Sequence, residues 1–249
     1  MRTVVAAVLL ALASMVPAAA DDLSDFAFDP HPGSHLPLAA PLFDEAGHRV
    51  RLGDFFAGRP VVLVLDYLRC RTLCGVTLSR LASALDALPP GTRQYDVVAL
   101  SIDPRDNPAD LVAGRRKYAG NRPGWHFLGG AEPAVRRIAE AVGFPYRFDP
   151  ALGQYVHPAG FVVASPNGIV SRYLLGVGPS PAALESALAD AKEGRAIGPL
   201  ERLLLLCHGE GAPLGRYTLP VETAFIIANL AAITGAVFVF AMIWRRRHG

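Results

Sequence analysis

The chain has little cysteine and little net charge, and both shortages limit what it can be. Its 249 residues include three cysteines, too few for a disulfide-stapled scaffold, so the fold must depend on a hydrophobic core. The formal net charge of +2 is too near zero to favour nucleic acid or a polybasic membrane surface as a partner. The sequence also lacks repeats, a nucleophile elbow, a phosphate-binding loop and a zinc-protease helix.

A secretory signal is predicted over residues 1–20. Arg2 precedes the apolar stretch Val4–Val16, and the small residues of Pro17–Ala20 form a cleavage site of the A-x-A type. An uncleaved anchor is the alternative, but the apolar stretch is shorter than the roughly 20 residues that cross a bilayer.

A transmembrane helix is predicted over residues 223–244. Phe225–Trp244 contains no charged residue and no proline, and the arginines of the tail 245–249 follow it directly. A buried core helix is the alternative, although a triple arginine would have to end it. Because positively charged flanks stay inside, we expect a single-pass protein of the inner (cytoplasmic) membrane, with its folded domain in the periplasm or outside the cell.

Between these ends the sequence predicts an extended arm over 21–41, a domain over 42–191 and a linker over 192–222. Within the domain, short apolar runs alternate with helical patterns. Strands are expected at 50–52, 61–66, 97–102, 125–128, 161–164 and 169–175, and helices at 74–88, 109–118, 133–142 and 181–191. This order predicts an α/β sandwich with a mixed central β-sheet.

Two cysteines, Cys70 and Cys74, follow directly on the strand expected at Val61–Asp66 and open a helix. If the helix begins near Cys70, their side chains share one face, with Cβ atoms about 5–6 Å apart. The helix N-terminus, Arg69 and Arg71 all favour thiolate over thiol. Outside the cytoplasm, such a pair is a disulfide, a redox couple or a soft-metal site. A purely structural bridge is the weakest of the three, because it would close too small a loop to add much stability.

His157 favours the metal interpretation. It precedes Pro158 in a loop just before the strand at Phe161. A strand, a Cys-x-x-x-Cys segment and a helix form the thioredoxin-like arrangement, in which that loop can lie beside the cysteine helix. Two thiolates and one imidazole suit copper, whereas zinc usually takes a fourth ligand. For a loop histidine taken alone, exposure at the surface is the alternative.

Three stretches taken together resemble the SCO/SenC family, and they follow one another in the family's order. The similarity covers most of Leu38–Ala191. The stretches are Asp66–Cys74, Ser101–Asp106 and Val142–Gly160, with further likeness at Ser165–Gly168 and Arg172–Leu174.

The resemblance implies a thioredoxin-like domain that binds a copper ion through Cys70, Cys74 and His157. It also implies a role in assembling the CuA centre of cytochrome c oxidase, with the CuA-bearing subunit and a thiol-reducing protein as partners and membrane lipid around the C-terminal helix. Asp103 would support the ligands or simply form a strand-end turn. The alternative function is that of a thiol–disulfide oxidoreductase using Cys70 and Cys74 as a redox pair.

The sequence departs from the family at two points. The family commonly carries proline after each cysteine, whereas Arg71 and Gly75 occupy those positions here. The expected anchor is C-terminal, whereas many members carry it at the N-terminus, so the chain resembles a C-terminally anchored branch. Loss of both prolines leaves open a third possibility, a tethered interaction domain or copper sensor with a degenerate site.

Overall fold

The computed structural model describes residues 27–69, 74–92, 94–196 and 198, and in the C-terminal region 226–231, 233–235, 242, 244 and 246. The predicted signal, most of the linker and of the cytoplasmic tail, and half of the predicted transmembrane helix therefore lie outside the described residues. Among the residues described, no helix is both long enough and apolar enough to span a membrane.

A five-stranded mixed sheet forms the centre of the domain, in the order β5-β4-β3-β8-β9. Strands β3, β4 and β5 run parallel, whereas β8 and β9 run antiparallel to their neighbours. The strands span Val61–Asp66 (β3), Asp96–Ser101 (β4), Trp125–Leu128 (β5), Gly160–Ala164 (β8) and Val170–Leu175 (β9). Every residue of β3 and β4 is buried, as continuous apolar runs predict for strands covered on both faces.

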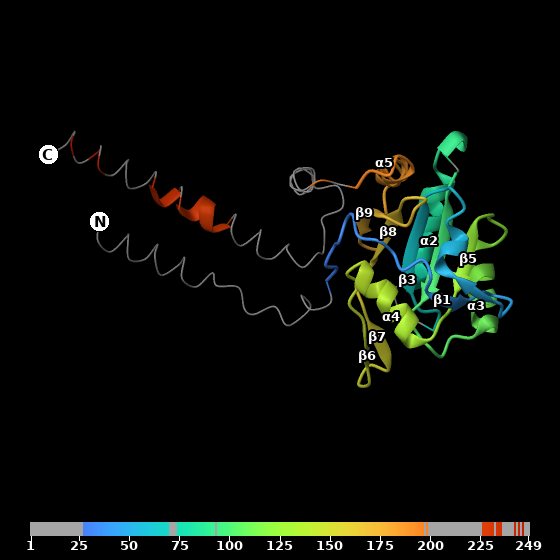
Figure 1. Cartoon of the computed structure of the whole chain (residues 1–249). Coiled ribbons are helices and arrows are strands. Elements are labelled where there is room, and N and C mark those ends of the chain that lie inside the picture. The colour runs from blue at the N-terminus through green and yellow to red at the C-terminus, as the bar shows by residue number, and fades with distance from the viewer. Residues whose placement is uncertain are drawn as a thin grey trace.

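Helices and the N-terminal segment cover the two faces of this sheet (Figure 1). Val62 and Val64 of β3 face a cluster that includes residues of three helices, whereas Leu63 and Leu65 face a second cluster. The first face carries α2 (Cys74–Asp86), α3 (Pro108–Gly114) and α5 (Pro181–Lys192), and the second carries α4 (Glu132–Ala141). The predicted α/β sandwich with a mixed sheet is thus confirmed, with strand and helix ends within a few residues of those expected.

The described part of the predicted arm packs against the domain. Phe28, Leu36 and Ala40 are buried in the core on the α4 face. Leu36 donates its backbone N–H to the carbonyl oxygen of Gly168 at 2.8 Å. The segment then continues into β1 (Pro41–Phe43), β2 (Arg49–Arg51) and the 3-10 turn η2 (Leu52–Phe55). Residues 28–40 are therefore an integral part of the core.

The ends of two helices follow their sequence signals. Asn107 caps α3, because its side-chain oxygen accepts the backbone N–H groups of Ala109 and Asp110. Gly143 adopts φ +61° just after α4, where an added Cβ would lie 1.6 Å from the carbonyl oxygen of Asp29. Only glycine fits this helix end, since both the backbone angle and the close approach exclude a side chain.

The helix expected at 109–118 is wrong in its second half. The α-helical hydrogen bonds stop at Gly114, and Arg115–Ala119 forms a π-helical turn, η4. Gly120 closes the wider turn by donating its backbone N–H to the carbonyl oxygen of Arg115 at 2.9 Å. A five-residue stretch is too short for its apolar spacing to distinguish a π turn from an α turn, which is why the pattern missed it.

A small hairpin, β6 (Arg147–Asp149) and β7 (Gln154–Val156), projects from one end of the domain (Figure 1). It was not expected from the sequence, because each of its strands is only three residues long. A further short 3-10 turn, η3 (Pro90–Thr92), follows α2.

Candidate metal centre

The predicted metal centre lies where β3 ends and the chain leads towards α2. Cys70 lies outside the described residues, and Cys74 is the first residue of α2, with its side chain outside the description. The pairing of the two thiols therefore stays a prediction. Among the side chains that are described, no three His, Cys, Asp or Glu residues gather closely enough to hold a metal.

His157 follows β7 and packs against the segment that precedes Cys70. Its ring stacks on Phe144 with centroids 5.5 Å apart and meets Tyr67 edge-on at 5.8 Å. Tyr67 directly follows β3 and is only 3% exposed. The structure thus brings His157, distant in the sequence, to the segment that continues through Leu68 and Arg69 into Cys70.

The hydrogen bonding of His157 fixes which ring nitrogen can bind a metal. Nδ1 lies 2.9 Å from the carbonyl oxygen of Pro158. Since a carbonyl oxygen only accepts, Nδ1 carries the proton and Nε2 carries the lone pair. Burial lowers the pKa of His157 and outweighs the hydrogen bond to Pro158, which raises it. The imidazole is therefore neutral at neutral pH, with Nε2 in the form that ligates metals.

A cluster of aromatic side chains continues from Tyr67, one of the two rings that contact His157. Tyr155 of β7 contacts Tyr67 at 5.4 Å, Tyr146 at 6.1 Å and Phe148 at 5.3 Å between ring centroids. The sequence analysis did not single out these residues. The spacing of Phe144, Tyr146 and Phe148 at every second position is the signal that could have revealed them, because alternate residues of an extended segment share one face.

Asp66, the last residue of β3, is a buried carboxyl that the sequence analysis also passed over. One oxygen accepts the backbone N–H of Tyr67 at 2.7 Å, and the other has no hydrogen-bond partner among the described residues. Burial and, to a smaller extent, the charge of Asp106 raise the pKa of Asp66 to about 7, against the hydrogen bond from Tyr67. A single charged residue ending a run of five apolar ones was the available signal.

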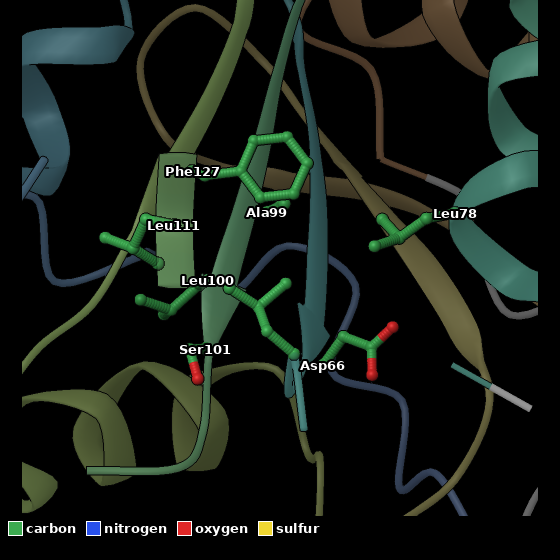
Figure 2. A pocket seen from close by; sticks show the side chains of 8 residues that line it. Asp66, Leu78, Ala99, Leu100, Ser101, Leu111 and Phe127 are labelled. Carbon is green, nitrogen blue, oxygen red and sulfur yellow. The ribbon is translucent and has the colours of Figure 1, made fainter. Parts of the chain in front are cut away.

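A small cavity of about 10 Å³ adjoins Asp66, enough for roughly one water molecule. Its other walls are mainly apolar and come from α2, β4, α3 and β5, as Figure 2 shows for Leu78, Leu111 and Phe127. Only Ser101 adds a polar side chain to this lining.

Asp103, proposed above as either a ligand support or a turn residue, forms a strand-end turn. Its carboxylate accepts hydrogen bonds from the backbone N–H of Arg105 and from Nε and Nη2 of the Arg105 guanidinium, the shortest at 2.7 Å. Burial alone would raise the pKa of Asp103, but the bonds from Arg105 outweigh it and lower the pKa. Asp103 is thus ionised at neutral pH and paired with Arg105.

The first turn of α2 explains why glycine follows the second cysteine. A Cβ built on Gly75 would lie 2.8 Å from the hydroxyl oxygen of Tyr118, which the π turn η4 presents to α2. The Tyr118 hydroxyl therefore occupies the space that a side chain at position 75 would need. Position 75 directly follows Cys74, the first residue of α2.

The comparison with known families decides what kind of domain this is. The family model described as SCO1/SenC matches residues 40–191, more than half of the chain. The chain belongs to the SCO1/SenC family. Its match covers the whole sheet and all the residues that surround His157. A comparison with curated proteins found no match.

Solved structures show that this SCO1/SenC domain shares its fold with proteins from bacteria and plants. A SCO1/SenC family lipoprotein of Bacillus anthracis strain Ames is 20% identical, with a TM-score of 0.56, covering 65% of this chain and 95% of that one. ScoI of Arabidopsis thaliana, solved with copper bound, is 19% identical, with a TM-score of 0.53, covering 66% and 99%. Copper-bound ScoI of Bradyrhizobium japonicum is 21% identical, with a TM-score of 0.50, covering 65% and 98%. The predicted family and thioredoxin-like fold are confirmed.

Proposed function

We propose that this chain is a membrane-tethered copper metallochaperone, with the copper ion as its cargo. Cys70, Cys74 and His157 hold the ion, and an acceptor with its own thiolates and imidazoles takes it by stepwise ligand exchange. The observation that carries this proposal is His157 itself. It is neutral, presents Nε2 as the donor and lies against Tyr67, three residues before Cys70. The copper-bound relatives lend support through the shared fold.

The acceptor that we propose is the CuA-bearing subunit of cytochrome c oxidase. The reduced cysteine pair is the form that binds copper, so a thiol-reducing protein must supply electrons in an oxidising compartment. A helix at 223–244 in the inner membrane, with the domain on the periplasmic side, would keep donor and membrane-bound acceptor on one surface. Such tethering raises their effective concentration without any new contact.

Anaerobic copper titration of the reduced full-length chain tests this function. We expect one tightly bound equivalent, lost in Cys70→Ser and Cys74→Ser and weakened in His157→Ala. A wild-type chain that binds no copper tightly with its thiols reduced would rule out the chaperone.

A second candidate function is that of a thiol–disulfide oxidoreductase. Here the Cys70 thiolate attacks a substrate disulfide and releases one substrate thiolate, and Cys74 then displaces the second to leave a Cys70–Cys74 disulfide. The position of the pair favours this alternative, because Cys74 is the first residue of α2 and a helix N-terminus favours the nucleophilic thiolate. The His157→Ala variant separates the two functions, since it should keep most thiol exchange while losing copper affinity.

A further inference from the structure

A wholly buried carboxylate, Asp106, holds the segment that leads into Cys70. It lies in the loop between β4 and α3, with a side-chain exposure of 0%. One oxygen accepts the backbone N–H of Leu68 at 3.0 Å and the hydroxyl of Ser101 at 2.6 Å. The other accepts Nε–H of Arg69 at 3.1 Å. Asp106 therefore binds two consecutive residues, and the next residue along the chain is Cys70.

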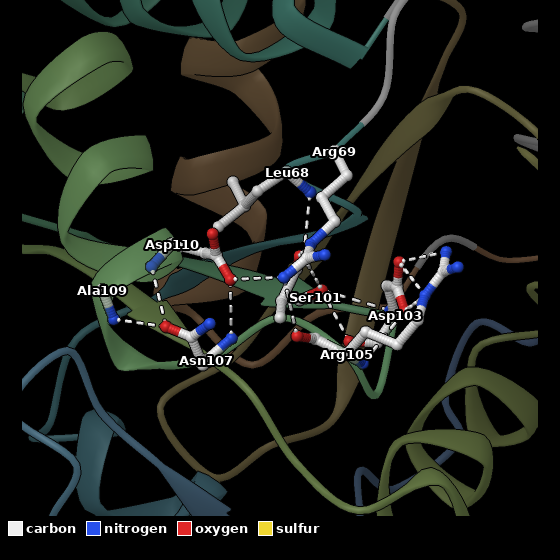
Figure 3. Close-up of polar contacts among 9 residues, drawn as sticks. Leu68, Arg69, Ser101, Asp103, Arg105, Asn107, Ala109 and Asp110 are labelled. Atoms are coloured by element: carbon white, nitrogen blue, oxygen red, sulfur yellow. Dashed lines mark hydrogen bonds and ion pairs between the residues drawn. The ribbon is translucent and has the colours of Figure 1, made fainter.

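Arg69 is fixed from its other side as well. Its Nη2 donates to the backbone oxygen of Arg105 at 3.1 Å and to the Asp110 carboxylate at 3.0 Å, as Figure 3 shows. Asp110 in turn accepts the backbone N–H of Asn107, the residue that caps α3. A side chain that is 48% exposed is thus held at both ends of its guanidinium. Because the guanidinium group is planar and rigid, an arginine side chain loses little conformational entropy for each hydrogen bond that it makes.

The contacts of Asp106 extend the hydrogen bonding between β3 and β4 past the ends of the two strands. The β3–β4 ladder ends at the pair Asp66 and Ser101, followed by one more bond from the N–H of Ile102 to the oxygen of Asp66. Past that point, the Asp106 carboxylate takes the place of a neighbouring strand and accepts the N–H of Leu68. A buried charge in this position is stable only with its bonds satisfied, so the geometry of the segment is tightly defined.

The same segment also contacts the predicted histidine ligand. Tyr67 packs on His157, and the residues directly after it, Leu68 and Arg69, are bound by Asp106. Three consecutive residues are thereby fixed between the histidine and the cysteine that we propose bind one ion. A change at Leu68 or Arg69 therefore acts on the residues that lead directly into Cys70.

We propose that Asp106 is a positioning residue for the cysteine pair. By holding Leu68 and Arg69, it sets where Cys70 stands relative to His157 and Cys74, and it thereby sets the affinity of the site. This inference rests on the proposed function, in which these three residues are the ligands. Residues that orient metal ligands typically change affinity by about 10–100-fold when they are removed.

The closing experiment compares Asp106→Asn with Asp96→Asn in the reduced full-length chain. Asp96 is a matched control, because its side chain is 3% exposed and pairs with Arg59, whose side chain is 48% exposed, at the opposite end of β4. Both variants remove a buried carboxylate beside a half-exposed arginine. Of the two carboxylates, only that of Asp106 contacts Leu68 and Arg69, the residues that lead into Cys70. Copper(I) affinity is measured by anaerobic competition with a chromophoric copper(I) chelator, and Tm is measured for each protein.

We expect Asp106→Asn to weaken copper(I) binding by about tenfold or more and Asp96→Asn to leave it within about twofold, even where the Tm values fall equally. If Asp106→Asn does not fold, Arg69→Lys replaces it, because lysine keeps the positive charge beside Cys70 and removes the Nε bond to Asp106. We expect that variant to weaken binding by about threefold. Wild-type affinity in the folded Asp106 variant, or equal losses in Asp106→Asn and Asp96→Asn, would overturn the inference.

A copper-free measurement keeps this inference separate from the proposed function. The third cysteine of the sequence, Cys207, is replaced with serine so that only the thiols of Cys70 and Cys74 remain. Equilibration with reduced and oxidised glutathione then gives the effective concentration of these two thiols towards each other. We expect it to fall by about fivefold in Asp106→Asn and to stay unchanged in Asp96→Asn. A wild type that binds no copper would refute the chaperone alone. Equal effective concentrations in the two variants would refute the positioning role.

Discussion

Replacing Asp66 with asparagine should make the domain more stable at high pH and leave it unchanged at low pH. The folded state holds the Asp66 carboxyl at a pKa of about 7, mainly through burial, whereas the ordinary value is 3.8. Between these values the folded chain keeps a proton that the unfolded chain has lost. The folded state therefore binds more protons, and the free energy of unfolding falls as the pH rises through this interval.

The size of this change in stability follows from the difference between the two pKa values of Asp66. At 1.36 kcal/mol per pH unit, the span from 3.8 to about 7 corresponds to roughly 4 kcal/mol of stability, present below pH 4 and lost above pH 7. Asparagine carries no charge at any of these values, and its side-chain oxygen can still accept the N–H of Tyr67. The variant should therefore match the wild type near pH 4 and exceed it by up to about 4 kcal/mol at pH 8.

Urea unfolding of the full-length chain at several values between pH 4 and pH 8 measures this difference directly. Titrating groups that do not interact with Asp66 cancel when the variant is compared with the wild type at each pH. Ser83→Ala, a change at an exposed hydroxyl on α2, is the control; neither side chain titrates between pH 4 and pH 8, so its difference should not depend on pH. If the Asp66→Asn difference is equally flat, Asp66 is ionised throughout in the folded state and the reasoning from its burial fails.

Three further substitutions test local features. Gly143→Ala should destabilise the domain by more than about 1 kcal/mol in urea unfolding, because φ is positive and Asp29 blocks the Cβ position; an unchanged midpoint would contradict that geometry. Asn107→Ala should cost about 1 kcal/mol through the lost cap of α3, and no loss would show that the cap is dispensable. Gly75→Ala should be better tolerated with Tyr118→Phe than alone, by about 0.5 kcal/mol or more in a double-mutant cycle, and purely additive effects would argue against the contact.

The sequence was enough to predict the parts of this fold that depend on local patterns. Val61–Asp66 and the strand beginning near Val97 are continuous apolar runs, and such runs are read correctly because burial on both faces leaves no room for polar side chains. His157 was selected from a loop because of the cysteine pair and the expected fold. The structure then placed its ring against Tyr67.

What the sequence did not reveal depends on contacts between distant segments. The Asp106 carboxylate lies near the start of α3 in the sequence, and nothing around it indicates that it binds Leu68 and Arg69, about 40 residues earlier. The burial of Phe28 depends on packing against Phe144 and Tyr173, which the sequence around Phe28 does not indicate. The segment 21–41 was therefore expected to be an extended arm.

The placement of residues 28–40 has a consequence for how the protein folds. The N–H of Gly33 pairs with the oxygen of Val170, and β3 needs β8 beside it to complete the sheet. Such long-range contacts make folding late and slow, because no early part of the chain can complete its core. Cys70 and Cys74 are therefore synthesised before β4, β5, β8 and β9. In the oxidising compartment that we propose for this domain, their thiols would meet oxidants before the sheet is complete. The proposed reductant would then act between folding and copper loading.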